Sequence, residues 1–272
     1  MSRFLLVSLM LLVVPLGACT SDDDPPAPSA NAQSAPVQSN NAPAGDALHE
    51  PFTELLARYV SDQNRVDYAG WKANDEDALL AYVNSLATVD PEALPSQQER
   101  MAYWINAYNA VTIQAMLEFW PLDSIKDKVS RLPGAYNVWD DYLFGPRQVS
   151  LNVMEHEKLR PMGDPRIHAG IVCASGGCPP LRAEAYLPTR LDDQLTDNVR
   201  VWLADTGRGV KLQGDEVYVS QIFDWFGDDF GADEQERMTW IADYVDDALA
   251  ARLRSGELDV EYLDYDWQLN KQ

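Results

Sequence analysis

The sequence predicts an α+β fold, a single, mainly helical domain with a small, largely antiparallel sheet. Apolar residues recur at three- and four-residue intervals in several segments, as they do in amphipathic helices. Two other segments have the pattern of β-hairpins, and no internal repeat divides the chain. With 272 residues, 46% of them apolar, the chain is long and apolar enough to bury a core.

The first half of the domain is expected to be helical. Residues 51–62 and 75–89 have amphipathic spacing. Ser96 and Glu99 have the spacing of a capping box, which opens the longest predicted helix, 97–120, ahead of a proline. Because apolar residues occur nearly all round this helix, we expect it at the centre of the domain.

Asn106 and Asn109 lie on the flank of that central helix, three positions apart. An unpaired buried amide costs about 1–3 kcal/mol, so both side chains need partners. One possibility is a site, in which Asn106 orients a catalytic imidazole and Asn109 contacts a ligand. The other is that both amides hold a loop in place, and this structural role is favoured.

The second half is expected to mix short strands with helices. Its predicted elements are a hairpin at 142–149, a short helix from Asn152 to Arg160, a buried strand at 166–172, a helix at 191–203, a hairpin at 209–219, a helix at 239–253 and an extended segment at 260–267. The predicted strand at 166–172 runs into a glycine-containing loop, 173–180.

The N-terminus is predicted to be a lipoprotein signal peptide, residues 1–18. Its apolar run after Arg3 is too short to span a bilayer. Residues 16–19 (LGAC) resemble the bacterial lipobox, so we expect lipid on Cys19; a plain signal peptide with an incidental cysteine is the alternative. Thr20, in place of an aspartate after that cysteine, implies the outer membrane, with the protein facing the periplasm.

A disordered tether is expected to follow the signal peptide. Residues 19–48 are rich in Pro, Ala, Ser and Asn and contain no aromatic residue, so they cannot bury enough surface to offset the entropy of ordering. The domain proper is therefore predicted to comprise residues 49–272.

The charge of the chain excludes some partners. The sequence has 43 acidic and 21 basic residues, a formal net charge of −22. Such a chain has no net attraction to nucleic acid or to an anionic membrane surface. We therefore expect membrane contact only through lipid on Cys19 and no nucleic-acid partner. A small-molecule or peptide-like ligand is compatible with the charge, whereas the sequence identifies neither a protein partner nor a cofactor, and we expect no cofactor.

Several sequence strings together resemble domain-of-unknown-function family 547. They are YWINAYNA at 103–110, EH and LR at 155–160, DPRIHA at 164–169 followed by Cys173, Cys178 and Pro179, SQIFDWF at 220–226 and YDWQLN at 265–270. The resemblance covers the chain from about His49 to Asn270. It implies an exported bacterial protein, and a suspected likeness of the family to papain-like thiol hydrolases implies a papain-like fold as one hypothesis.

The groups that could carry chemistry gather in one window. They are Glu155, His156, Arg160, Asp164, Arg166, His168, Cys173, Ser175 and Cys178. The first interpretation is a thiol-dependent hydrolase or transferase acting on an amide or peptide-like bond. In it the Cys173 thiolate attacks, and His156 or His168 carries the proton.

The pairing within such a site is not fixed by the sequence. On a regular strand His168 and Cys173 would point to opposite faces, which favours His156 as the partner of Cys173, or else His168 with Cys178. Glu155, Asp164, Asn106 or Asn109 would orient the imidazole. Arg160 and Arg166, with Asn109, would bind the ligand.

Two further interpretations use the same cysteines. In an oxidising compartment Cys173 and Cys178 are expected to form a disulfide, which would make the protein a non-catalytic periplasmic binding or scaffold module. Alternatively, both cysteines and both nearby histidines could bind zinc. The cysteines are separated by four residues, which is wider than the common spacing of a zinc knuckle, so we expect no metal.

Two other features have structural interpretations. We expect the tryptophans at 104, 120, 139, 202, 225, 240 and 267 to pack mainly in the core, although they could line a groove. The acidic residues Asp224, Asp228, Asp229, Asp233 and Glu234 lack the spacing of a calcium loop and are expected to form a solvated face.

Overall fold

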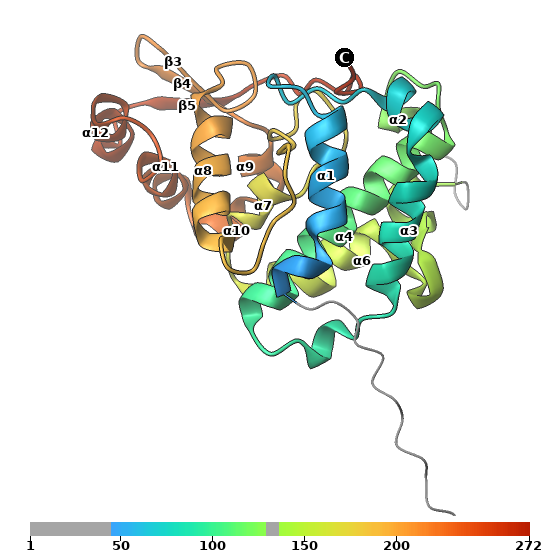
Figure 1. The fold of residues 1–272 in the computed structure, drawn as a ribbon. Helices are drawn as coiled ribbons and strands as arrows, with labels where there is room; N and C mark the ends of the chain where they lie inside the picture. The colour runs from blue at the N-terminus through green and yellow to red at the C-terminus, as the bar shows by residue number, and fades with distance from the viewer. Residues whose placement is uncertain (1–44, 129–135) are drawn as a thin grey trace, which may run out of the picture. The chain divides into compact units, whose positions relative to one another are not determined.

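The computed structural model describes residues 45–128 and 136–272 (Figure 1). The predicted signal peptide, the lipidation site Cys19 and most of the predicted tether lie outside the described residues. Leu48, the last residue of that predicted tether, is buried in the core.

The described elements are mostly helices. The α-helices are α1 (Glu50–Tyr59), α2 (Tyr68–Asn74), α3 (Glu76–Ala87), α4 (Gln97–Glu118), α5 (Val138–Asp141), α6 (Leu151–Val153), α7 (Ile167–Gly170), α8 (Leu191–Ala204), α9 (Ile222–Trp225), α10 (Gly227–Phe230), α11 (Glu234–Ala242) and α12 (Asp247–Ser255). The 3-10 helices are η1 (Gly45–Leu48), η2 (Pro91–Ala93), η3 (Ile125–Lys128), η4 (Gly145–Arg147) and η6 (Arg160–Met162), and η5 (Met154–Leu159) is a π-helix. The strands are β1 (Leu143–Phe144), β2 (Val149–Ser150), β3 (Val210–Gln213), β4 (Glu216–Val219) and β5 (Asp259–Tyr262). This composition confirms the predicted α+β class.

Helix α4 is the central helix that the sequence predicts. The Ser96 side chain accepts a hydrogen bond from the Glu99 backbone N–H, while the Glu99 carboxylate accepts from the Ser96 backbone N–H, which completes the capping box. From Met101 to Leu117 nearly every side chain of α4 is buried. Helices α2 and α3 pack directly against it, and α1 packs on both of them.

Both predicted hairpins are present, each closed by a short turn. Strands β1 and β2 pair antiparallel, as do β3 and β4. The turn between β3 and β4 places Gly214 at φ +66°, a backbone conformation that glycine adopts without steric cost. Strand β5, from the predicted final extended segment, adds to β4 in parallel and completes a three-stranded sheet.

The predicted strand at 166–172 is wrong, because residues 167–170 form the short helix α7. The Asp164 carboxylate accepts a hydrogen bond from the Arg166 backbone N–H at 3.0 Å and so starts a helical turn. Every residue of α7 is buried. A short, continuous apolar run has the same pattern in a buried helix as in a buried strand, so periodicity could not separate the two.

Two predicted helices have different boundaries. The helix expected to begin at Asn152 begins one residue earlier, at Leu151, where Ser150 accepts a hydrogen bond from the Val153 backbone N–H, and it continues as the π-helix η5. The single helix expected at 239–253 is two helices, each with its own aspartate cap, Asp233 for α11 and Asp246 for α12. The described residues, 45–128 and 136–272, belong to one compact unit.

The core of this unit has two clusters of buried side chains. The larger one surrounds α4 and includes α1 to α3 and the residues up to α7. The smaller one joins α8 to α12 with the β3-β4-β5 sheet. In Figure 1 the two groups of elements lie on opposite sides of the unit, blue to green for the first and orange to red for the second. Within the described ranges, no helix is long and apolar enough to cross a membrane.

Candidate functional site

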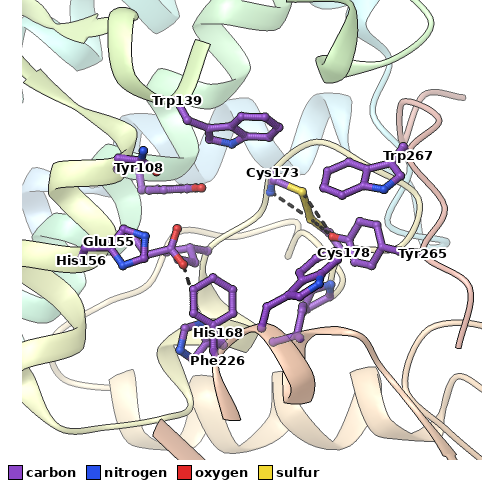
Figure 2. A pocket seen from close by; sticks show the side chains of 15 residues that line it. Tyr108, Trp139, Glu155, His156, His168, Cys173, Cys178, Phe226, Tyr265 and Trp267 are labelled. Carbon is purple, nitrogen blue, oxygen red and sulfur yellow. Dashed lines mark hydrogen bonds and ion pairs between the residues drawn. A yellow bond between two sulfur atoms is a disulfide. The ribbon is translucent and has the colours of Figure 1, made fainter. Parts of the chain in front are cut away.

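A pocket of about 260 Å³ lies where the two core clusters meet (Figure 2). It is lined by Tyr108, Trp139, Asn152, Glu155, His156, His168, Ile171, Cys173, Cys178, Pro179, Ile222, Trp225, Phe226, Tyr265 and Trp267. These residues come from α4, α5, α6, η5, α7, the loop after α7, α9, the residue between α9 and α10, and the C-terminal segment. Most of the predicted chemical groups therefore do share one cavity.

The two predicted thiols are joined in a disulfide. Cys173 and Cys178 have Cα atoms 6.4 Å apart, and Cys173 is half-buried at the pocket wall. Hydroxyl groups gather beside the sulfurs: the Tyr265 hydroxyl lies 3.3 Å from the Sγ of Cys173 and 3.2 Å from that of Cys178. Ser175 Oγ lies 3.1 Å from Cys173 Sγ.

The expected hydrogen bond between a cysteine and an imidazole is absent from the described part of the chain. The nearest hydrogen-bonding partners of the sulfurs are hydroxyl groups and a backbone N–H, and the imidazoles bond elsewhere. In Figure 2 Glu155 and His156 lie at one side of the pocket and the disulfide at the other.

The C-terminal segment fixes the cysteine loop. The backbone N–H groups of Gly176 and Gly177 donate to the carbonyls of Gln268 and Asp266 at 2.7 and 2.8 Å. A Cβ at Gly177 would lie 2.9 Å from the Asp266 backbone nitrogen, closer than real Cβ atoms come, so only glycine fits. This strap is also what brings Tyr265 into contact with both sulfurs.

Asn106 and Asn109 hold backbone, as the favoured structural role predicts. Asn109 donates to the Gly170 carbonyl at 2.8 Å and accepts from the Val172 N–H at 2.9 Å, directly ahead of the cysteine loop. Asn106 makes the same pair of bonds to the backbone of Tyr186. Neither asparagine lines the pocket, so the predicted orienting and ligand-binding roles have no contact to support them.

We expect Asn109→Ala to lower the free energy of unfolding by about 2 kcal/mol, because it leaves two buried backbone groups without partners. Urea denaturation of the purified protein measures this. Asn74→Ala is the matched control: it removes one exposed amide bond, and its effect should stay below about 0.5 kcal/mol. Equal losses in the two variants would contradict the role given to Asn109.

An ion network lies behind the pocket and is centred on Asp229. Arg160 donates two hydrogen bonds to the Asp229 carboxylate, at 2.6 and 2.8 Å, and His168 Nε2 lies 2.7 Å from it. Burial opposes ionisation of Asp229, but the hydrogen bonds from His168 and Arg160 outweigh it and lower the pKa of the carboxyl below its ordinary value. The prediction that Asp229 belongs to a solvated acidic face is therefore wrong, since the carboxylate faces the protein.

The protonation states of both histidines follow from this network. The ionised Asp229 carboxylate can only accept a hydrogen bond, so His168 Nε2 carries a proton. In the neutral ring, His168 Nδ1 therefore has no proton and presents a lone pair. A guanidinium can only donate, so Arg160 Nη1, 3.0 Å from His156 Nδ1, makes that nitrogen the acceptor. Burial lowers the pKa of His168 and of His156, which keeps both rings neutral near pH 7.

Glu155 is the carboxyl that faces the pocket. Glu155 is 8% exposed, and burial raises the pKa of its carboxyl to about 7. The charge of Arg160 and a hydrogen bond with Tyr108 oppose this shift, whereas the charge of Asp229 adds to it. Glu155 Oε1 lies 3.9 Å from the unprotonated Nδ1 of His168. Within the described ranges no lysine or arginine forms an ion pair with Glu155. The ionised carboxyl therefore has no cationic partner.

Arg166 lies away from the pocket. It forms ion pairs with Asp164 and Asp192, each at 2.7 Å, and the pair with Asp192 links the start of α7 to the start of α8. Arg160 does not line the cavity either, since its guanidinium is engaged by Asp229. The two predicted ligand-binding arginines thus hold structure around the site.

Aromatic rings form the rest of the wall. Trp225 is 44% exposed and stacks on Trp267 with ring centroids 5.7 Å apart, and both pack against Tyr265. Trp139 meets Trp267 edge-on at 6.2 Å. The expectation that tryptophans pack mainly in the core is correct for Trp202 but not for these three, which line the cavity.

A metal site is not apparent. In the described ranges no group of three or more His, Cys, Asp or Glu side chains is arranged to hold a metal ion.

Comparison with known proteins gives one match. Residues 91–203 match the family model described as "Protein of unknown function, DUF547". No curated protein and no solved structure matches the chain. The matched segment includes Glu155, His168 and both cysteines of the disulfide, whereas Asp229 and Tyr265 lie beyond it.

Proposed function

We propose that this chain, whose residues 91–203 match the DUF547 family model, is an envelope protein that binds a small ligand in the aromatic pocket that Glu155 lines. The observation that carries this proposal is the Glu155 carboxyl, buried among aromatic rings without a cationic partner in the described residues. Aromatic walls with a few convergent polar groups are typical of ligand sites. In this proposal the disulfide is a staple for the loop that forms one wall.

Ligand binding can be tested through Trp225. A thermal-shift screen of small metabolites against the purified protein should yield ligands that raise its Tm, because binding to the folded state alone stabilises it. Trp225→Ala should remove that shift. Val201→Ala is the matched control, since Val201 is equally exposed, at 44%, and does not line the pocket. Ligands that stabilise Trp225→Ala as much as the wild type would refute binding in this pocket.

The second candidate is a thiol-dependent hydrolase or transferase. The observation that favours it is that half-buried Cys173 lines the same pocket as Glu155, whose pKa burial raises to about 7. An external thiol would first reduce the disulfide. The Cys173 thiolate would then attack an amide carbonyl, the amine would leave with a proton from Glu155, and water would hydrolyse the thioester.

Thiol titration separates the two candidates. If the pocket only binds, protein isolated from the envelope should have no reactive thiol before reduction, and Cys173→Ala should bind ligands as the wild type does. A thiol that labels rapidly below pH 7 after mild reduction, and more slowly in His156→Ala or Glu155→Gln, would instead support the hydrolase and contradict a staple.

We also propose that lipid on Cys19 holds the protein at the outer membrane, facing the periplasm, after removal of residues 1–18. Cys19→Ser protein should then either appear in the soluble fraction or keep its signal peptide. Ser21→Ala, two residues on, is the control and should leave the distribution unchanged. A Cys19→Ser protein that stays on the membrane with its signal peptide removed would contradict lipidation.

A further inference from the structure

The charges around the pocket do not cancel. Arg160 neutralises Asp229, with which it forms two hydrogen bonds, and both His156 and His168 are neutral rings. The phenol groups of Tyr108 and Tyr265 are also neutral, because burial raises the pKa of each. Ionised Glu155 therefore carries a negative charge that forms no ion pair with a lysine or arginine of the described residues, and Arg160, whose charge partly offsets it, is engaged by Asp229.

The Glu155 carboxyl lines the same cavity as several aromatic rings. A cation over the face of an aromatic ring is attracted by the ring's quadrupole, most strongly over tryptophan. The protein already uses this contact: the Lys126 ammonium lies 3.6 Å from the centroid of the Trp267 ring. Trp139, Trp225 and Tyr265 offer further rings around the same cavity.

We propose that the ligand of this pocket carries an organic cation, an ammonium or quaternary ammonium group, which contacts the Glu155 carboxylate within the rings of Trp139, Trp225 and Tyr265. This inference rests on the proposed binding function and specifies its ligand class. A buried carboxylate without a paired counter-charge is costly even when it accepts a hydrogen bond, as Glu155 does from Tyr108, and a cationic ligand would supply that charge.

The size of the cavity sets the size of the group. At about 260 Å³ it is slightly smaller than the roughly 300–1,000 Å³ of pockets for drug-sized ligands. It therefore suits a compact head group, either of a free small molecule or at the end of a longer one. Trp225 lines the cavity and is 44% exposed, so this part of the wall lies at the protein surface, where the rest of a longer ligand could extend.

The test compares ligands that differ in charge but not in shape. Choline is titrated against its neutral isostere 3,3-dimethyl-1-butanol at pH 8, with tryptophan fluorescence as the signal because Trp139, Trp225 and Trp267 line the cavity. A second cation, N-acetyl-lysine methylamide with a free side-chain amine, is titrated in the same way. Comparing it with choline shows whether the pocket prefers a lysine side chain or a quaternary ammonium group. We expect at least one of the two cations to bind about tenfold more tightly than the isostere.

Glu155→Gln should weaken binding of that cation about tenfold and leave binding of the isostere unchanged. Glu157→Gln is the matched control on the same helix, exposed and outside the pocket. Circular dichroism checks that each variant is folded. As pH falls below 7, wild-type affinity for the cation should fall, because Glu155, whose pKa is about 7, becomes neutral.

The outcomes separate the two levels of the proposal. If the isostere binds as tightly as both cations and Glu155→Gln changes nothing, the cationic ligand class is wrong while the binding function stands. If neither cations nor isostere bind and the metabolite screen gives no Trp225-dependent ligand, the proposed function itself fails. Cation binding that survives in Glu155→Gln but is lost in Glu157→Gln would also overturn the inference.

Discussion

Asp229→Ala is expected to lower the free energy of unfolding by about 3 kcal/mol at pH 7, near the lower end for breaking a buried ion pair. The side chain of Asp229 is 22% exposed and accepts from both Arg160 and His168, so its loss leaves a guanidinium and a buried imidazole without their acceptor. Chemical denaturation measures the change. Asp228→Ala is the matched control: its side chain is 95% exposed and meets Arg237 only at 3.7 Å, so it should cost less than about 0.5 kcal/mol.

The pH dependence of this loss has a definite sign. The folded-state pKa of Asp229 is lowered from its ordinary 3.8, because hydrogen bonds from His168 and Arg160 outweigh burial. The stability that Asp229 contributes is therefore fully present above pH 3.8 and is lost as the pH falls through the lowered value. A gap between wild type and Asp229→Ala that narrows between pH 8 and pH 5 would contradict the network.

As the pH rises from 4.5 to 8, the free energy of unfolding of Glu155→Gln is expected to increase by about 3 kcal/mol relative to that of the wild type. Burial raises the pKa of Glu155 from 4.5 to about 7, so the protonated form is favoured in the folded protein. That preference adds stability below pH 4.5, and the stability is lost as the pH rises through 7. Glutamine keeps a neutral group of the same shape and does not titrate.

The measurement is the free energy of unfolding of wild type and variant at several pH values. Exposed Glu157 supplies the control, and the difference between Glu157→Gln and the wild type should not change with pH in this way. A Glu155→Gln variant whose difference from the wild type stays constant from pH 5 to pH 8 would mean that the carboxyl ionises normally.

The elements that could be predicted from the sequence are those fixed by nearby residues. The Ser96–Glu99 capping box and the apolar surface of α4 are encoded within one segment, and so is the β3–β4 turn at Gly214. Local chemistry determines both a helix start and a tight turn. The same reasoning placed Glu155, His168 and the cysteines in one window of chain, and the pocket does hold them.

What the sequence could not predict depends on contacts between distant residues. Asp229 lies 61 residues from His168, and in its own segment it is one acid among several. Tyr265 lies 87 residues beyond Cys178 and reaches the sulfurs only because the C-terminal segment bonds to Gly176 and Gly177. The sequence string around Tyr265 supported the resemblance to the family, but it gave no indication of the partner of that side chain.

The ionisation of Glu155 is the central claim, and carbon-13 NMR of glutamate side-chain carboxyl groups measures it directly. One titrating signal should be missing in Glu155→Gln, which assigns it. We predict that in the wild type this signal titrates with a pKa of about 7, because the carboxyl is buried without a cationic partner in the described residues. Adding a ligand cation that binds should shift the midpoint to lower pH. A midpoint near the ordinary 4.5, unchanged by any cation, would contradict both the buried acid and the ligand class inferred from it.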